Sequence, residues 1–167
     1  MLDGIDFAIE GGLANKDNWD VLARNLSSYN NNETSGDNNK KVYLSASPQC
    51  PFPDASLENA LGTGLFDFVW IQFYNNPQCE FGNNGSMDLL ENSWNKWIAN
   101  SSNTSMVFLG LPASPDAVSY GGYISATNLT SQVLPAIKNT TKYGGVMLWS
   151  RYYDVKTNYS TSIINYV

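Results

Sequence analysis

The sequence predicts an α/β fold in which helices pack on a parallel β-sheet, and three observations lead to this prediction. Short apolar runs rich in β-branched and aromatic residues alternate with longer segments whose apolar residues recur every three or four positions. Five such strand–helix units follow one another, and consecutive units of this kind place their strands parallel. The predicted strands are largely hydrophobic, and residues 66–74 are apolar on both faces, which is typical of a buried parallel sheet.

The elements follow one another in a regular order. Strands are expected at residues 2–12, 41–47, 66–74, 106–111 and 144–150. Helical spacing links Trp19, Leu22, Leu26 and Tyr29, then Met87, Leu90, Trp94 and Trp97, and then Leu129, Val133, Leu134 and Ile137. Short helices are expected in residues 54–64 and 160–167, and a loop at residues 30–39. Pro135 is expected to kink its helix because proline cannot donate an N–H.

Two architectures fit this order of elements. One is an open, doubly wound sheet, and the other is part of a closed (β/α)₈ barrel. No Gly-rich phosphate loop follows the first strand, which disfavours the nucleotide-binding version of the open sheet. The pattern therefore favours the barrel.

The composition bounds the possible functions. The chain has 167 residues, 43% hydrophobic and 14% charged, which suggests one globular domain. Its net charge of −6, without a cluster of Lys and Arg, argues against nucleic-acid binding. No apolar run approaches the roughly 20 residues needed to span a membrane. The sequence contains no His, which excludes Ser–His catalysis and His–metal sites, and no cofactor or metal is expected.

Two features point to the secretory pathway. The chain has two cysteines, Cys50 and Cys79, an even number that fits a disulfide in an oxidising compartment, although both could be free thiols. The glycosylation pattern Asn-x-Ser/Thr occurs at Asn25, Asn32, Asn84, Asn100, Asn103, Asn128, Asn139 and Asn158. We expect a secreted protein, extracellular or vacuolar.

The first strand has two chemically different faces. In LDGIDFAIEGG, successive side chains of a strand point to opposite sides, so Asp6, Ala8 and Glu10 share one face. Two carboxylates on one strand face indicate catalytic chemistry or a polar interior.

Five motifs resemble one known family. LDGIDFAIE resembles the signature D-G-x-D-x-D-x-E on the fourth barrel strand of plant class III chitinases, members of glycoside hydrolase family 18. SPQCPFPD, FDFVWIQFYNNPQC, GLPASP and YGGVMLWS resemble that family's segments at the fifth to eighth strands, in the same order. The resemblance implies a TIM (β/α)₈ barrel of which residues 1–167, one partial domain, supply only the last five βα units.

The resemblance also implies an incomplete barrel. A TIM barrel has eight βα units in typically about 250 residues. The first and fifth strands of this chain would then have unpaired edges, so we expect marginal stability, self-association or dependence on a partner.

The implied chemistry is substrate-assisted hydrolysis of β-1,4-linked N-acetylglucosamine polymers, with Glu10 as general acid. Chitin or chito-oligosaccharide is the expected partner. The family has aspartate where this chain has Ala8, and the first three βα units of the barrel are missing. For both reasons activity is expected to be weak or absent. The alternatives are a non-catalytic chitin-binding, lectin-like or storage protein on the same fold, or a substitution made to trap substrate.

The resemblance assigns further residues. Asp6 would support the acidic pair, and Gln72, Tyr74 and Asn75 would line the substrate cleft, with the Tyr74 hydroxyl bonded to the acetamido oxygen. Trp149 would form the floor under the sugar, followed by a cis peptide bond, with Met147 on the same strand face. Cys50 and Cys79 would form a disulfide between the loops after the fifth and sixth barrel strands.

Overall fold

The computed structural model describes residues 3–10, 18–31, 41–82, 85–102 and 105–167. Its strands are β1 (Gly4–Phe7), β2 (Tyr43–Ala46), β3 (Phe68–Gln72), β4 (Met106–Pro112) and β5 (Tyr143–Trp149). They form one sheet in the order β1-β2-β3-β4-β5, and every neighbouring pair is parallel. The predicted α/β class and the five parallel strands are confirmed.

Helices connect the strands. They are α1 (Trp19–Ser28), α2 (Glu58–Leu61), α3 (Asp88–Asn100), α4 (Ala126–Asn128), α5 (Leu134–Ile137), α6 (Arg151–Thr157) and α7 (Tyr159–Ile163). Single turns of 3₁₀-helix are η2 (Tyr29–Asn31) and η3 (Pro115–Ala117), and η4 (Leu129–Val133) is a π-helical segment. Pro135 lies in the first turn of α5 directly after η4, so the irregularity expected at this proline is a π-helical segment that precedes it.

Several predicted boundaries were too wide. The ladder of β1 ends at Phe7 instead of continuing to residue 12, and residues 11 and 12 lie outside the described residues. Strand β3 is two residues shorter at each end than the predicted segment 66–74. The last helix ends at Ile163, and most of the predicted loop at residues 30–39 also lies outside the described ranges.

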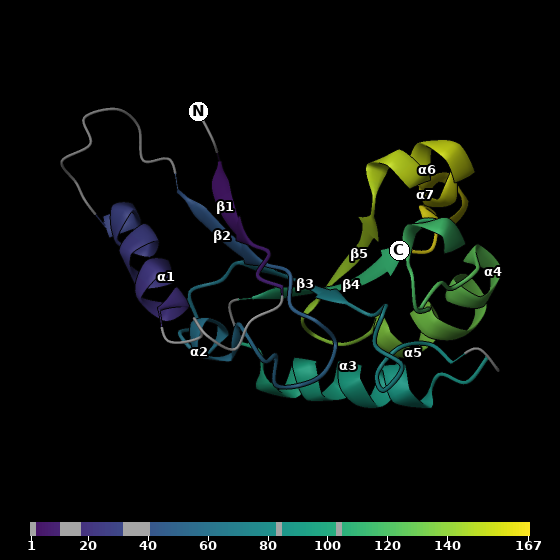
Figure 1. Ribbon diagram of the computed structural model, residues 1–167, viewed down its shortest axis with the longest axis horizontal. Coiled ribbons are helices and arrows are strands. Elements are labelled where there is room, and N and C mark those ends of the chain that lie inside the picture. The colour runs from purple at the N-terminus through teal and green to yellow at the C-terminus, as the bar shows by residue number, and fades with distance from the viewer. Residues whose placement is uncertain (1–2, 11–17, 32–40, 83–84, 103–104) are drawn as a thin grey trace.

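Helices cover the outer side of the sheet. Figure 1 shows the sheet bent, with β1–β2 and β5 rising on either side of β3 and β4 while the helices lie outside them. Alternate strand residues point outward and are buried against these helices: Leu44, Ala46, Val69, Ile71, Val107 and Leu109. Trp94 of α3 is fully buried there and packs on Phe73, with 6.1 Å between ring centroids.

The inner side of the sheet identifies the architecture. It carries an aromatic cluster in which Trp70 lies against Phe108, with ring centroids 4.2 Å apart, and stacks on Phe68 at 5.5 Å. A doubly wound sheet would have helices on this side as well, whereas here the helices lie on the outer side (Figure 1). The curved parallel sheet with an inner side-chain layer is consistent with part of a TIM barrel.

Candidate functional site

The carboxyl ends of the strands surround a cleft of about 670 Å³. It is lined by Asp6, Ala8, Glu10, Ser45, Ser47, Gln49, Trp70, Gln72, Tyr74, Asn75, Met147 and Trp149. The structure therefore brings together all eight side chains that the sequence placed in a site, from three separate strands and the segments that follow them. This end of the strands is where TIM barrels bind their substrates.

Asp6 is held by the neighbouring strand. Its carboxylate accepts hydrogen bonds from the hydroxyls of Ser45, at 2.6 Å, and Ser47, at 3.0 Å, both on or just after β2. These contacts fix the orientation of the carboxylate beside Ala8, whose methyl group offers no hydrogen-bonding atom.

Gln72 connects β3 to Glu10. The side chain of Gln72 is 5% exposed, and its Nε2 donates to Glu10 Oε1 at 3.0 Å and to the Ser47 carbonyl at 2.8 Å. A buried amide needs partners for its donors, and these two contacts satisfy both N–H groups. Since Ser47 O is a backbone atom, the amide is fixed and in turn orients the Glu10 carboxylate.

Tyr74 provides a hydroxyl that stays protonated. Burial, followed by the negative charge of Glu10, raises the pKa of the Tyr74 phenol well above its ordinary value of 10. The phenol is therefore a hydrogen-bond donor at physiological pH. Gly122 packs directly on this residue: a Cβ at position 122 would lie 2.7 Å from Tyr74 Cβ. Only glycine fits here, since its φ of +91° also disfavours side chains.

Asn75 organises the wall of the cleft. It has a left-handed backbone conformation, with φ of 58°. Its Oδ1 accepts the backbone N–H groups of Ser119 and Tyr120, each at 3.1 Å, and its own N–H donates to the Gly121 carbonyl. The amide oxygen is therefore bound to the loop after η3, and this contact joins the loops that follow β3 and β4.

Strand β5 contributes an exposed aromatic side chain to the cleft. Trp149 is 52% exposed and lines the cleft together with Met147. The Trp149–Ser150 peptide bond is cis, as the family resemblance implied. An exposed indole on a rigid strand offers a flat apolar surface for a sugar ring.

Four lining residues were not identified from the sequence: Ser45, Ser47, Gln49 and Trp70. The two serines alternate with Leu44 and Ala46, so the same parity rule that was applied to β1 would have placed them on the inner face.

The predicted disulfide between Cys50 and Cys79 is present, with 5.8 Å between the Cα atoms. It joins the segment after β2 to the segment after β3. Among the residues that the structure describes, no group of three or more His, Cys, Asp or Glu side chains is placed to hold a metal ion. No helix in the same ranges is both long and apolar enough to cross a bilayer.

The fold and the cleft define part of a (β/α)₈ barrel with carboxylates and aromatic side chains at the carboxyl ends of its strands. Residues 1–122 match the family Glycosyl hydrolases family 18. The chain belongs to this family, and its relatives fit the class III chitinase group recognised from the motifs.

Individual relatives agree with this assignment. The acidic endochitinase of Cicer arietinum is 53% identical over 163 residues, which cover 98% of this chain and 51% of the relative. The crystal structure of the ICChI chitinase from Ipomoea carnea aligns with a TM-score of 0.88 and 49% identity, covering 99% of this chain and 57% of that one. The tamarind chitinase-like lectin aligns with a TM-score of 0.80 and 35% identity, covering 96% and 56%. This chain thus spans about half the length of the curated relatives it matches.

Proposed function

We propose that this chain carries the acid-bearing part of the catalytic site of a chitinase-type glycoside hydrolase that acts on β-1,4-linked N-acetylglucosamine polymers. The observation that carries this proposal is the contact between Gln72 Nε2 and Glu10 Oε1 in a cleft that also holds Tyr74 and Trp149. A fixed carboxyl group beside a protonated phenol and an exposed indole suits a sugar that must be held and protonated at one bond.

In the proposed reaction, Glu10 donates its proton to the glycosidic oxygen. The carbonyl oxygen of the substrate's 2-acetamido group attacks the anomeric carbon, and the bond to the leaving sugar breaks. Tyr74 donates its hydroxyl hydrogen to the acetamido group and Trp149 supports the ring. Water then opens the oxazolinium ion and returns a proton to Glu10, so no cofactor takes part.

Ala8 should impair this reaction. An aspartate at position 8 would orient the acetamido N–H and stabilise the positive charge of the oxazolinium ion. An alanine methyl group does neither, and the loss of one preorganised electrostatic group typically costs about 10²–10³ in rate. Asp6 does not take its place, because it lies two residues before position 8 and hydrogen bonds from Ser45 and Ser47 hold its carboxylate at β2.

A second candidate is a lectin-like or storage protein that binds chitin without cleaving it. Ala8 favours this alternative, because it removes a catalytic group while leaving Trp149, Met147 and Gln72 in the cleft. The similarity to a chitinase-like lectin is compatible with it.

Binding and hydrolysis of chitohexaose by the chain and by its Ala8→Asp variant test the proposal, with Ala8→Asn as an uncharged control of similar size. We expect binding in all three and hydrolysis at least about 100-fold faster in Ala8→Asp than in either other protein. Binding without hydrolysis in every variant would point to the incomplete barrel as the cause or to the lectin-like alternative. Failure of the unaltered chain to bind chitohexaose would contradict both functions.

The proposal includes the setting of the protein. We infer secretion, extracellular or vacuolar, with glycosylation at some sequons and a role in plant defence. The Cys50–Cys79 disulfide supports an oxidising compartment. Chitin or chito-oligosaccharide is the proposed partner, without nucleic acid or membrane, and the whole chain forms one partial domain.

A further inference from the structure

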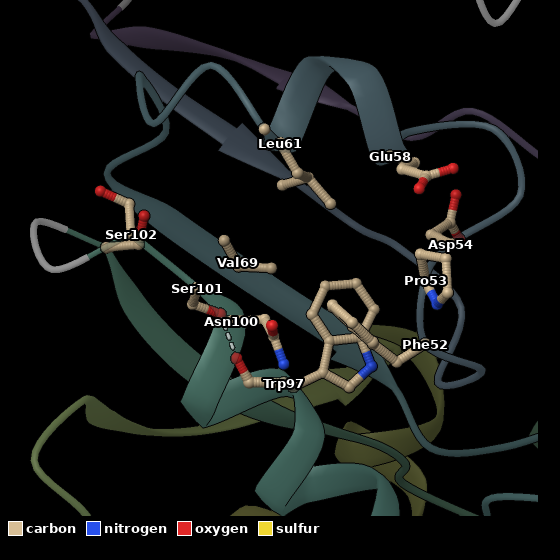
Figure 2. A pocket seen from close by; sticks show the side chains of 12 residues that line it. Phe52, Pro53, Asp54, Glu58, Leu61, Val69, Trp97, Asn100, Ser101 and Ser102 are labelled. Carbon is tan, nitrogen blue, oxygen red and sulfur yellow. Dashed lines mark hydrogen bonds between the residues drawn. The ribbon is translucent and has the colours of Figure 1, made fainter.

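A second cavity, of about 470 Å³, lies on the outer side of the sheet. It is bounded by α2 and the carboxyl-terminal part of α3, with Val69 of β3 between them (Figure 2). Trp70, the next residue of β3, lines the catalytic cleft instead. Because successive strand residues point to opposite faces, the two cavities lie on opposite sides of the same strand.

The lining of this outer cavity combines apolar and polar parts. Phe52 and Trp97 meet edge to face, with ring centroids 5.0 Å apart at 82°, and Leu61 faces the same space (Figure 2). Figure 2 shows Asp54 and Glu58 together at one end. A pyranose ring has the matching character, with apolar C–H faces and a rim of hydroxyl donors. The cavity volume also falls within the range of about 300–1,000 Å³ found for ligand pockets.

Asp54 has capacity for one more donor. Its buried carboxylate accepts three backbone N–H groups, from Gln49, Ser56 and Leu57. An ionised carboxylate offers about four acceptor positions. A sugar hydroxyl in the cavity could take the fourth position without displacing any of the hydrogen bonds that the described residues make to Asp54.

A glycosylation sequon lies at the edge of the same cavity. Asn100, the last residue of α3, begins the triplet Asn100-Ser101-Ser102, and all three residues line the cavity. Asn100 is exposed and lies three residues after Trp97, on the same face of the helix. Its Nδ2 donates to the Lys96 carbonyl at 2.8 Å, and a glycosylated asparagine keeps one N–H with which to make this bond.

We propose that this outer cavity seats the first N-acetylglucosamine of an N-linked glycan on Asn100. The sugar lies against the Phe52–Trp97 pair and donates a hydroxyl to the Asp54 carboxylate. The glycan therefore fills the space between α2 and α3 and stabilises the fold. The inference rests on the proposed secretory location and is independent of the catalytic cleft.

The test uses the chain secreted from a eukaryotic host. Glycopeptide mass spectrometry measures occupancy, and enzymatic release of glycans from the native protein measures how well each one is shielded. Asn25 is the matched control, because it is an exposed sequon on a helix and does not line this cavity. We expect glycan on Asn100, released about tenfold more slowly than glycan on Asn25, and equal release rates after denaturation.

Two variants distinguish a glycan that is bound in the cavity from one that is attached to Asn100 but extends into solvent. Leu61→Trp fills the cavity and should bring release at Asn100 to the rate at Asn25. Asn100→Gln should lower the unfolding temperature of the secreted protein by more than that of bacterially produced, unglycosylated protein, in which the variant loses only the hydrogen bond to the Lys96 carbonyl. This second comparison does not depend on whether the Leu61→Trp variant folds correctly.

The outcomes distinguish the two proposals. A glycan on Asn25 with none on Asn100, or equal release rates at the two sites, would contradict the proposed binding of the glycan in the cavity. Either result leaves the proposed secretion intact. The absence of glycan from every sequon would contradict both the proposed glycosylation and the proposed binding of a glycan in the cavity. An equal change in unfolding temperature on Asn100→Gln with and without glycosylation would also contradict the proposal, because the stability would then come from the asparagine side chain itself.

Discussion

At the scale of single residues, the most informative contact is the amide of Gln72 on the carboxylate of Glu10. The two residues are 62 positions apart, and their hydrogen bond of 3.0 Å forms across the inner face of the barrel wall. Gln72 is a positioning residue here, because it fixes the group that is proposed to protonate substrate while its own second N–H is bound to the backbone.

Replacing this amide should reduce catalysis more than binding. In the Ala8→Asp protein, we expect Gln72→Leu to lower kcat about 10- to 100-fold, since a misplaced catalytic group loses its near-attack geometry. The KM for chitohexaose should change far less. Gln49→Leu is the control, because Gln49 lines the same cleft and its side chain accepts a hydrogen bond from Asn76 rather than contacting Glu10. Equal losses of kcat in the two variants would contradict the positioning role.

A second residue-scale prediction concerns alkaline stability. The buried Tyr143 hydroxyl has no hydrogen-bond partner among the described residues, and burial raises the pKa of this phenol to about 12. Between pH 10 and 12 the unfolded chain releases this proton while the folded chain retains it, so stability falls as pH rises through this window. Tyr143→Phe removes the effect.

Urea unfolding at pH 8 and pH 12 measures how much Tyr143 contributes to the loss of stability at high pH. We expect Tyr143→Phe to be at least as stable as the unaltered chain at pH 8 and to lose roughly 1–2 kcal/mol less on going to pH 12. Tyr120→Phe, at a 79% exposed position, should leave the pH dependence unchanged. An identical alkaline loss in the Tyr143→Phe protein would contradict the assignment.

At the scale of elements, the loops after the strands are fixed by a few specific contacts. Asn75 binds the segment that contains Tyr120 and Gly121, and Gly122 lies against Tyr74. The short helix α6 shows the same principle, since its one buried residue is Asp154. Although burial opposes it, hydrogen bonds from Ser160 and the Arg151 contact lower the pKa of the Asp154 carboxyl.

The Gly122–Tyr74 contact can be tested by adding one methyl group. Gly122→Ala should weaken chitohexaose binding at least about tenfold, because a Cβ there displaces Tyr74, and it should also lower the unfolding temperature. Gly85→Ala is the matched control. Gly85 also has positive φ, +80°, but a Cβ there meets no atom within 4 Å. The control should lose about 1 kcal/mol of stability from backbone strain and keep its affinity for the sugar. Similar affinity losses in both variants would show that strain, not displacement of Tyr74, is responsible.

At the scale of the whole molecule, the sheet described here is open at both sides. Strands β1 and β5 each pair with one neighbour among the described residues. Apolar side chains on the strands are correspondingly accessible, among them Ile5, Tyr43 and Met106, each at least 40% exposed. Unpaired strand edges beside exposed apolar groups favour association between chains.

The isolated 167-residue chain should therefore self-associate. Light scattering after size-exclusion chromatography should show a mass that rises with concentration, and Ile5→Lys, a charge on edge strand β1, should reduce it. Val21→Lys, at an exposed position on α1, serves as the control and should have little effect. A monomer at all concentrations with a single sharp unfolding transition would contradict this prediction.

The α/β class and eight of the twelve residues that line the cleft could be predicted from the sequence and its family motifs. Strand periodicity is a local property, so parity alone placed Asp6, Ala8 and Glu10 on one face and Gln72 with Tyr74 on another strand. The family motifs added the Cys50–Cys79 pairing and the order of the barrel strands. Helix α6 was not predicted, because its one buried residue is Asp154, a charged side chain that the search for apolar periodicity does not detect.

Contacts between distant parts of the chain become visible only in the folded structure. It alone gave the Gln72–Glu10 contact, the binding of Asn75 to the loop after η3, and the cavity beside Asn100. Such contacts are set by the curvature of the sheet and the packing of helices on it. No single segment encodes these properties, because their energies arise only when residues far apart in sequence are brought together.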